Sequence, residues 1–209
     1  MKHLPKAWLR AATAVGARDD VAAEGAQLLA AYAEPHRHYH DLAHLDDVLR
    51  HVGELAPSAA RPDVVRLAAW FHDAVYDPTA SDNEERSARL AELALARLRV
   101  ADGVGREVAR LVRVTADHSP LPGDADGEVL CDADLAVLAT GPEAYRRYAE
   151  AVRAEFAHLG DDAFRRGRAA VLRSLLARVQ LFSTPAGRSA WEDAARANMT
   201  AELRRLDDS

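Results

Sequence analysis

The chain has 209 residues, of which 49% are hydrophobic and 29% charged, proportions typical of a folded globular protein that exclude disordered and fibrous classes. The formal net charge of -6 argues against general nucleic-acid binding, which depends on clustered Lys and Arg. The single cysteine, Cys131, excludes an internal disulfide and any multi-cysteine metal site, so a bound metal would need nitrogen and oxygen ligands.

Apolar residues recur at three- and four-residue spacing, with Gly and Pro between these stretches, which predicts an all-α fold. No linker separates domains, so we expect one compact helical domain over residues 1–209, with a motif-bearing core at about 30–140 and C-terminal packing helices at about 142–206. The predicted helices are Lys6–Val15, Asp20–Ala33, Asp41–Leu55, Asp63–Tyr76, Asn83–Val100, Gly105–Asp117, Glu128–Ala139, Pro142–His158, Asp161–Val179 and Pro185–Leu206.

The N-terminus shows no signal-peptide pattern, because Lys2, Lys6 and Arg10 interrupt its apolar residues. No stretch approaches the roughly 20 apolar residues of a membrane span. We therefore expect a cytoplasmic protein without a membrane partner, either a monomer or a homodimer.

Histidines are concentrated near the start of the third predicted helix, where five of the nine fall within residues 36–51. If that helix begins near His40, then His40 and His44 lie on one face, with Asp47 and His51 further along it. Histidines on a helix face are more often solvated or structural than metal-bound. This segment alone therefore does not establish a metal site.

The next helix is apolar on nearly every side over residues 64–75 (VVRLAAWFHDAV), which predicts that it is buried with His72 and Asp73 inside it. Burying an ionised carboxylate costs several kcal/mol unless a cation or hydrogen-bond donors compensate it. The pair therefore indicates a metal or an ion-pair network. The alternative is a contact between Arg66 and Asp73 on a partly exposed face.

A third carboxylate lies in residues 128–139 (EVLCDADLAVLA). The helical wheel places Asp134 within an apolar arc, whereas Asp132 falls on the opposite side and is expected to be solvated or a favourable helix-start charge.

Three helices could therefore bring two imidazoles and two carboxylates together, from His44, His72, Asp73 and Asp134. These ligands suit one divalent ion, Mn, Fe, Zn, Ni or Co, with Mg less well suited.

Five blocks in this order, PHRHYHDLAHL, AAWFHDAVYDP, DNEERSA, VTADH and LCDADLAVL, resemble the HD superfamily of metal-dependent phosphohydrolases. They are most similar to a group of predicted HD phosphohydrolases, and the resemblance spans about residues 30–200. It implies an HD-type helical bundle that hydrolyses a phosphomonoester, phosphodiester or nucleotide-like phosphate through a metal-activated water. The partner would be a small phosphorylated substrate, with nucleotides included.

By this resemblance His44 is the first metal ligand, His72 and Asp73 are the central pair, and Asp134 is the closing ligand. Asp73 would also orient the attacking water and take its proton.

The segment from Tyr39 to His44 also resembles the YHNxxH segment of cyclic-nucleotide phosphodiesterases, which implies that His40 is the general acid for the leaving oxygen. Asp41 replaces the Asn of that segment, so the comparison is local and does not identify a cyclic nucleotide as substrate.

Asn83 stands where many two-metal HD proteins carry a further His, so we expect one ion rather than two. His118 could touch substrate, support a second ion or cap a helix end. Glu84 and Asp77 could orient water or metal ligands. Equally, Glu84 could be a first-turn helix carboxylate and Asp77 a turn residue before Pro78.

An anionic substrate needs cations, and Arg37 is the nearest candidate, with Arg168 a weaker one. A solvated surface arginine is the default for both. Two other functions remain open: an HD-type di-iron oxygenase, and a non-catalytic metal- or nucleotide-sensing module or structural helical protein.

Overall fold

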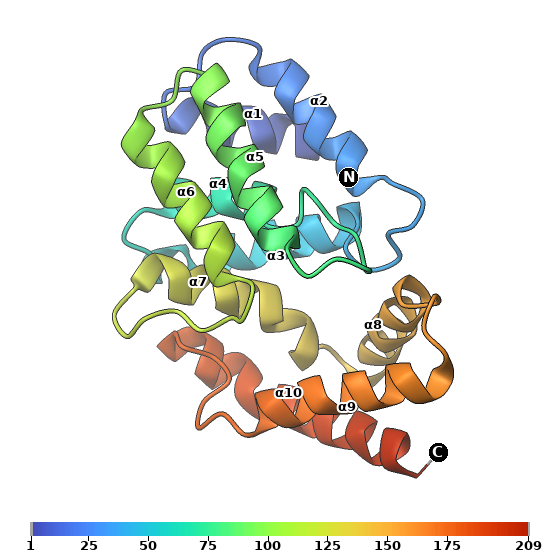
Figure 1. Ribbon diagram of the computed structural model, residues 1–209. Coiled ribbons are helices and arrows are strands. Elements are labelled where there is room, and N and C mark those ends of the chain that lie inside the picture. Colours follow the sequence, from blue (N-terminus) through green and yellow to red (C-terminus); the bar gives the residue numbers. More distant parts are fainter. Residues whose placement is uncertain (1, 209) are drawn as a thin grey trace.

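The computed structural model describes residues 2–208, and within them it shows ten α-helices, two short 3₁₀-helices and no strand (Figure 1). The predicted all-α class is confirmed. The α-helices are α1 (Leu4–Ala14), α2 (Val21–Tyr32), α3 (Leu42–Leu55), α4 (Pro62–Phe71), α5 (Asn83–Arg97), α6 (Asp102–Val114), α7 (Ala125–Leu135), α8 (Pro142–Glu155), α9 (Asp161–Leu176) and α10 (Pro185–Asp207). The 3₁₀-helices are η1 (Ala56–Ser58) and η2 (Ala136–Ala139).

The apolar side chains form two buried clusters. The first lies among α1 to α7, where the rings of Trp8 and Trp70 pack edge to face at 5.5 Å. The second lies among the end of α7, η2 and helices α8 to α10, around Phe182 and Met199. Trp191 packs against both clusters, and in Figure 1 α7 lies between the helices that form them.

Helix α3 has a defined start because the Asp41 carboxylate accepts hydrogen bonds from the backbone N–H groups of Ala43 and His44, at 2.8 and 3.1 Å. This cap satisfies two of the backbone donors that every helix start leaves unpaired. The same bonds place His44 in the first turn of α3.

Helix α4 ends at Phe71, so His72 and Asp73 lie in the turn after the helix and not inside it, which corrects the predicted end at Tyr76. The reason is Arg37, whose guanidinium donates to the carbonyl of Asp73 at 2.6 Å and to that of Ala74 at 3.1 Å. These carbonyls are thereby satisfied without a further helical turn.

Asp132 is only 1% exposed, so the expectation of a solvated side chain is wrong. Its carboxylate accepts hydrogen bonds from the backbone N–H of Ser183 at 2.7 Å and of Thr184 at 2.8 Å, and from the Thr184 hydroxyl at 2.7 Å. The helical wheel predicted a solvent-exposed side for α7, but α7 is covered on both sides. The first apolar cluster covers one side, and the helices of the second apolar cluster cover the other. These hydrogen bonds of Asp132 therefore hold the segment before α10 against α7.

Within residues 2–208, none of the helices combines the length and the apolar character that crossing a membrane requires.

Candidate metal centre

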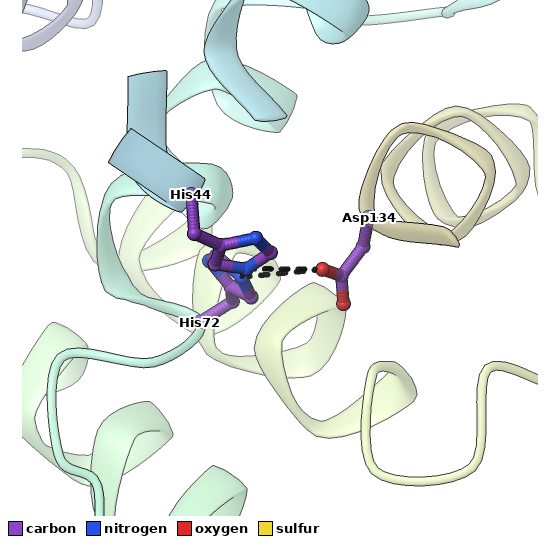
Figure 2. Close-up of side chains that lie close together, drawn as sticks. All are labelled: His44, His72 and Asp134. Atoms are coloured by element: carbon purple, nitrogen blue, oxygen red, sulfur yellow. Dashed lines mark hydrogen bonds and ion pairs between the residues drawn. The ribbon is translucent and has the colours of Figure 1, made fainter. Parts of the chain in front are cut away.

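Three side chains from separate segments converge in the arrangement that Figure 2 shows: His44 of α3, His72 after α4 and Asp134 of α7. The Nε2 atom of His44 lies 3.1 Å from Nε2 of His72 and 3.2 Å from Oδ1 of Asp134, and the latter two atoms are 3.6 Å apart. Neighbouring ligands of an ion with bonds of about 2.1 Å lie roughly 3.0–3.4 Å apart. These three residues can therefore hold a metal ion.

Asp73 lies against the two histidines of this group. Its Oδ2 atom is 3.3 Å from Nε2 of His44 and 3.1 Å from Nε2 of His72. The alternative contact with Arg66 is not formed, because Arg66 pairs with Asp63 at 2.8 Å. All four side chains that the sequence singled out as ligands thus meet at one place.

Hydrogen bonds behind the cluster orient two of its members. Nδ1 of His72 lies 2.8 Å from the carbonyl of Ala69, an acceptor that fixes the proton on Nδ1 and leaves Nε2 to face the cluster. Nε2 of His118 lies 2.7 Å from Oδ2 of Asp134, whose other oxygen faces the two histidines. His118 follows α6 in a left-handed conformation, φ 49°, and contacts a cluster residue, so it is more than a helix cap.

The buried charges shift the pKa values of all four groups. Burial opposes the protonated form of His44, but hydrogen bonds to Asp134 and Asp73 outweigh it and raise the pKa of His44 to about 9. The pKa of His72 is also raised, against burial, by the charge of Asp73. Burial disfavours both carboxylates, yet the charge of His72 holds the pKa values of Asp73 and Asp134 well below their usual range. The cluster therefore stabilises positive charge, which protons or a metal cation can supply.

The C-terminal part of the chain adds a residue that the sequence analysis missed. Glu155, at the end of α8, is buried, and its Oε2 atom lies 2.7 Å from Nδ1 of His40 and 2.8 Å from the Tyr76 hydroxyl. Its Oε1 atom accepts from the backbone N–H groups of residues 38–40. Burial alone would raise the pKa of Glu155, but the His40 hydrogen bond and charge lower it to about 2.

His40 is therefore held by a carboxylate at Nδ1, and within residues 2–208 its Nε2 atom has no hydrogen-bond partner. The ring stacks on Tyr76 with centroids 4.2 Å apart, and lies 5.6 Å from the ring of the metal-site residue His44. No sequence signal pointed to Glu155, because it lies 115 residues from His40 in a helix rich in other charges.

Arg37 is buried, which corrects the default of a solvated surface arginine. Its guanidinium donates to the carbonyls of His40, Asp73 and Ala74 and to the Glu34 carboxylate. These bonds tie the segment before α3 to the turn after α4. Arg37 thus positions the turn that carries His72 and Asp73 against the segment that carries His40.

Arg168 is not solvated either, since its side chain is 9% exposed. Its guanidinium donates to both carboxylate oxygens of Glu202, at 2.8 and 3.0 Å, and to the Tyr148 hydroxyl at 3.2 Å. Glu202 therefore balances its charge.

Asp77 and Glu84 make no hydrogen bond or ion pair with the metal cluster among the described residues. Asp77 accepts from the N–H and the hydroxyl of Thr79, as a turn residue does, and Glu84 lies in the first turn of α5. The Asn83 amide bonds the backbone N–H and carbonyl of Asp77 at 3.0 and 2.9 Å. Both ends of that amide are thus engaged away from the cluster.

The cluster opens onto two hollows on either side of Tyr39 and Tyr148. His44 and Asp134 line the first, of about 300 Å³. His40, His118 and Asp134 line the second, of about 410 Å³. A small molecule can therefore reach Asp134 and His40 from the same space.

Comparisons with protein-family models, with curated proteins and with solved structures find no match to this chain. The likeness to the HD superfamily therefore depends on the motif residues. Four of them, His44, His72, Asp73 and Asp134, are the side chains that meet in the structure.

Proposed function

We propose that this protein is a metal-dependent phosphohydrolase of the HD type, acting on a small phosphomonoester, phosphodiester or nucleotide-like phosphate. The observation that carries the proposal is the meeting of His44, His72, Asp73 and Asp134 beside a hollow that His40 also lines. Two imidazoles and two carboxylates balance the charge of one divalent ion, and the imidazole of His40 would transfer a proton.

A divalent ion held there, Mn, Fe, Zn, Ni or Co with Mg less suited, would lower the pKa of a water molecule so that hydroxide is available near neutral pH. One ion is favoured over two because Asn83 is committed to the Asp77 backbone. The same commitment disfavours a di-iron oxygenase, which needs ligands for two irons.

Asp73 is the group that accepts the proton of the attacking water. The water oxygen forms a new bond to phosphorus while the bond from phosphorus to the leaving oxygen breaks. The Asp73 carboxylate is the candidate because its Oδ2 atom lies beside the two histidines that would hold the ion.

His40 gives a proton from Nε2 to the leaving oxygen, so the products are an alcohol and a phosphate. Glu155 holds Nδ1 and stabilises the charged imidazolium before the transfer. Proton donation from a positioned side chain contributes about 10²-fold to 10⁴-fold in rate.

The test measures bound metal by elemental analysis and phosphate release with added Mn, Co, Ni, Mg or Zn. We expect the parent to release phosphate, Asp73→Ala to lose both metal and turnover, and His40→Ala to keep metal but lose at least about 10²-fold in kcat. His3→Ala, an exposed histidine that lines none of the hollows, is the matched control and should match the parent.

Three results contradict the proposal. Equal metal in the parent and in folded Asp73→Ala removes Asp73 from the ligands. Loss of metal in His40→Ala makes His40 a ligand and not the acid. Full metal without release of phosphate from any ester indicates a binding or sensing module.

A further inference from the structure

A third hollow, of about 380 Å³, lies beside His40 and differs in character from the other two. It is lined by side chains of α8 and α9 and of the segment between them, mostly apolar: Val152, Phe156, Leu159, Phe164 and Val171. The volume and the apolar lining are those of sites that bind small organic groups.

This third hollow adjoins the second. Both are lined by His40, Tyr39, Tyr148, Arg168 and Val171. His40 therefore lines both spaces, and a phosphate beside Asp134 in the second hollow would lie close to an organic group in the third. The leaving group must lie next to the acid that protonates its oxygen, and the proposed acid, His40, lines the third hollow.

The charges around the third hollow also restrict which chemical groups can bind in it. Its one arginine, Arg168, is balanced by Glu202 through two hydrogen bonds. The remaining side chains, apart from His40, are apolar or tyrosine. Binding a second phosphate there would be unfavourable, because no unpaired cation in the hollow would balance its charge. Binding a neutral apolar group would be favourable, because its apolar surface would be removed from water.

Val171 supplies an independent observation. This residue lies on α9 in the wall of both hollows and is 52% exposed, which makes it one of five exposed large hydrophobic residues among those that the structure describes. A ligand seated in the third hollow would cover its apolar surface.

We propose that the third hollow binds the leaving group of the substrate, so that the substrate is a phosphomonoester of an alcohol that carries a neutral apolar or aromatic group. This inference rests on the proposed phosphohydrolase function. Hydrolysis would release the alcohol from the third hollow after His40 protonates its oxygen, and inorganic phosphate from the second.

Gly167 allows a direct test. It lies on α9 in the wall of the third hollow, and a Cβ atom there would meet nothing within 4 Å, so the first side-chain atom of Gly167→Leu fits and the remaining atoms are expected to occupy the hollow. Gly53→Leu is the matched control, because Gly53 is also an exposed helical glycine with open space and lies outside the hollows.

The experiment measures calorimetric binding of ethylphosphonate and of 2-phenylethylphosphonate to the Mn-loaded protein. We expect the phenyl compound to bind at least about tenfold more tightly to the parent and to Gly53→Leu. In Gly167→Leu the preference should fall to about twofold or less, with the affinity for ethylphosphonate unchanged. Val171→Ser, a change at an exposed position, should reduce the same preference.

Equal binding of the two phosphonates by the parent, or a preference that survives in Gly167→Leu, would overturn the inference. Phosphate release from ethyl phosphate tests the proposed function separately. Release without a phenyl preference refutes only the third-hollow inference, whereas a phenyl preference without release from any ester refutes the hydrolase.

Discussion

The two halves of the molecule contribute differently to the site. The part built from α1 to α7 supplies His44, His72 and Asp134. The sequence draws attention to this part through its histidine-rich segment at residues 36–51 and through charged groups in an apolar run. The part built from α8 to α10 supplies Glu155 and the apolar wall, from residues that look ordinary in the sequence. In the proposed mechanism, metal binding therefore belongs to the first half, while proton transfer and the fit of the substrate depend on the second.

Changing Glu155 to Gln tests this division with the largest expected effect. The uncharged amide still accepts hydrogen bonds but no longer stabilises the His40 imidazolium. We expect kcat to fall by about 10²-fold while bound metal stays at the parent level. Steady-state kinetics and elemental analysis measure the two quantities.

The double variant of Glu155→Gln with His40→Ala provides the control. It should be no slower than His40→Ala alone, because both changes remove the same step. A further loss of similar size, or a loss of metal in Glu155→Gln, would show that Glu155 acts elsewhere.

Asp132→Ala tests how α7 is joined to the segment before α10. The change leaves the backbone N–H groups of Ser183 and Thr184 and the Thr184 hydroxyl without their acceptor. We expect the free energy of unfolding to fall by about 3 kcal/mol, because buried donors lose their partner. Urea denaturation measures this loss. Metal content should persist in the folded fraction, and its disappearance would mean that Asp132 also supports the metal centre.

The pH dependence of the metal-free protein follows from His44. Its pKa is about 9 in the folded protein against an ordinary 6.5, so the folded state holds the proton more tightly. The resulting stability is complete below pH 6.5 and is lost as the pH rises to about 9. We expect a loss of about 3 kcal/mol over that window by urea denaturation.

The metal-loaded protein is the control for the pH series. In it the ion replaces the protons of the cluster, so the decline from pH 6.5 to 9 should be absent. A metal-free protein as stable at pH 9 as at pH 6.5 would contradict the cluster electrostatics.

His118→Ala should have the smallest effect. Nε2 of His118 orients Asp134 without belonging to the three closest ligands, so its loss should weaken metal affinity by about 10-fold to 100-fold without abolishing it. Competition with a chelator measures the change. An unchanged affinity would mean that Asp134 is held by its helix alone.

The sequence predicted the parts of this structure that local patterns encode. The all-α class follows from hydrophobic periodicity, and the helix predicted to begin at Asp41 begins one residue later, at Leu42. His72 and Asp73 stood out because charged groups in an apolar run need partners.

The missed features depend on contacts between distant segments. Arg37 ends α4 by bonding carbonyls 36 and 37 residues away, which no helical propensity encodes. Asp132 is buried because α10 arrives on the side of α7 that the wheel marked as solvated. The pairing of Glu155 with His40 likewise exists only after α8 packs against the segment before α3.

Anomalous X-ray scattering from crystals of the Mn-loaded protein would show whether the cluster holds an ion. We expect one strong peak, about 2.0–2.3 Å from Nε2 of His44, Nε2 of His72 and carboxylate oxygens of Asp73 and Asp134. A peak at another place, or crystals of the loaded protein with no peak among these four side chains, would contradict the proposed metal site.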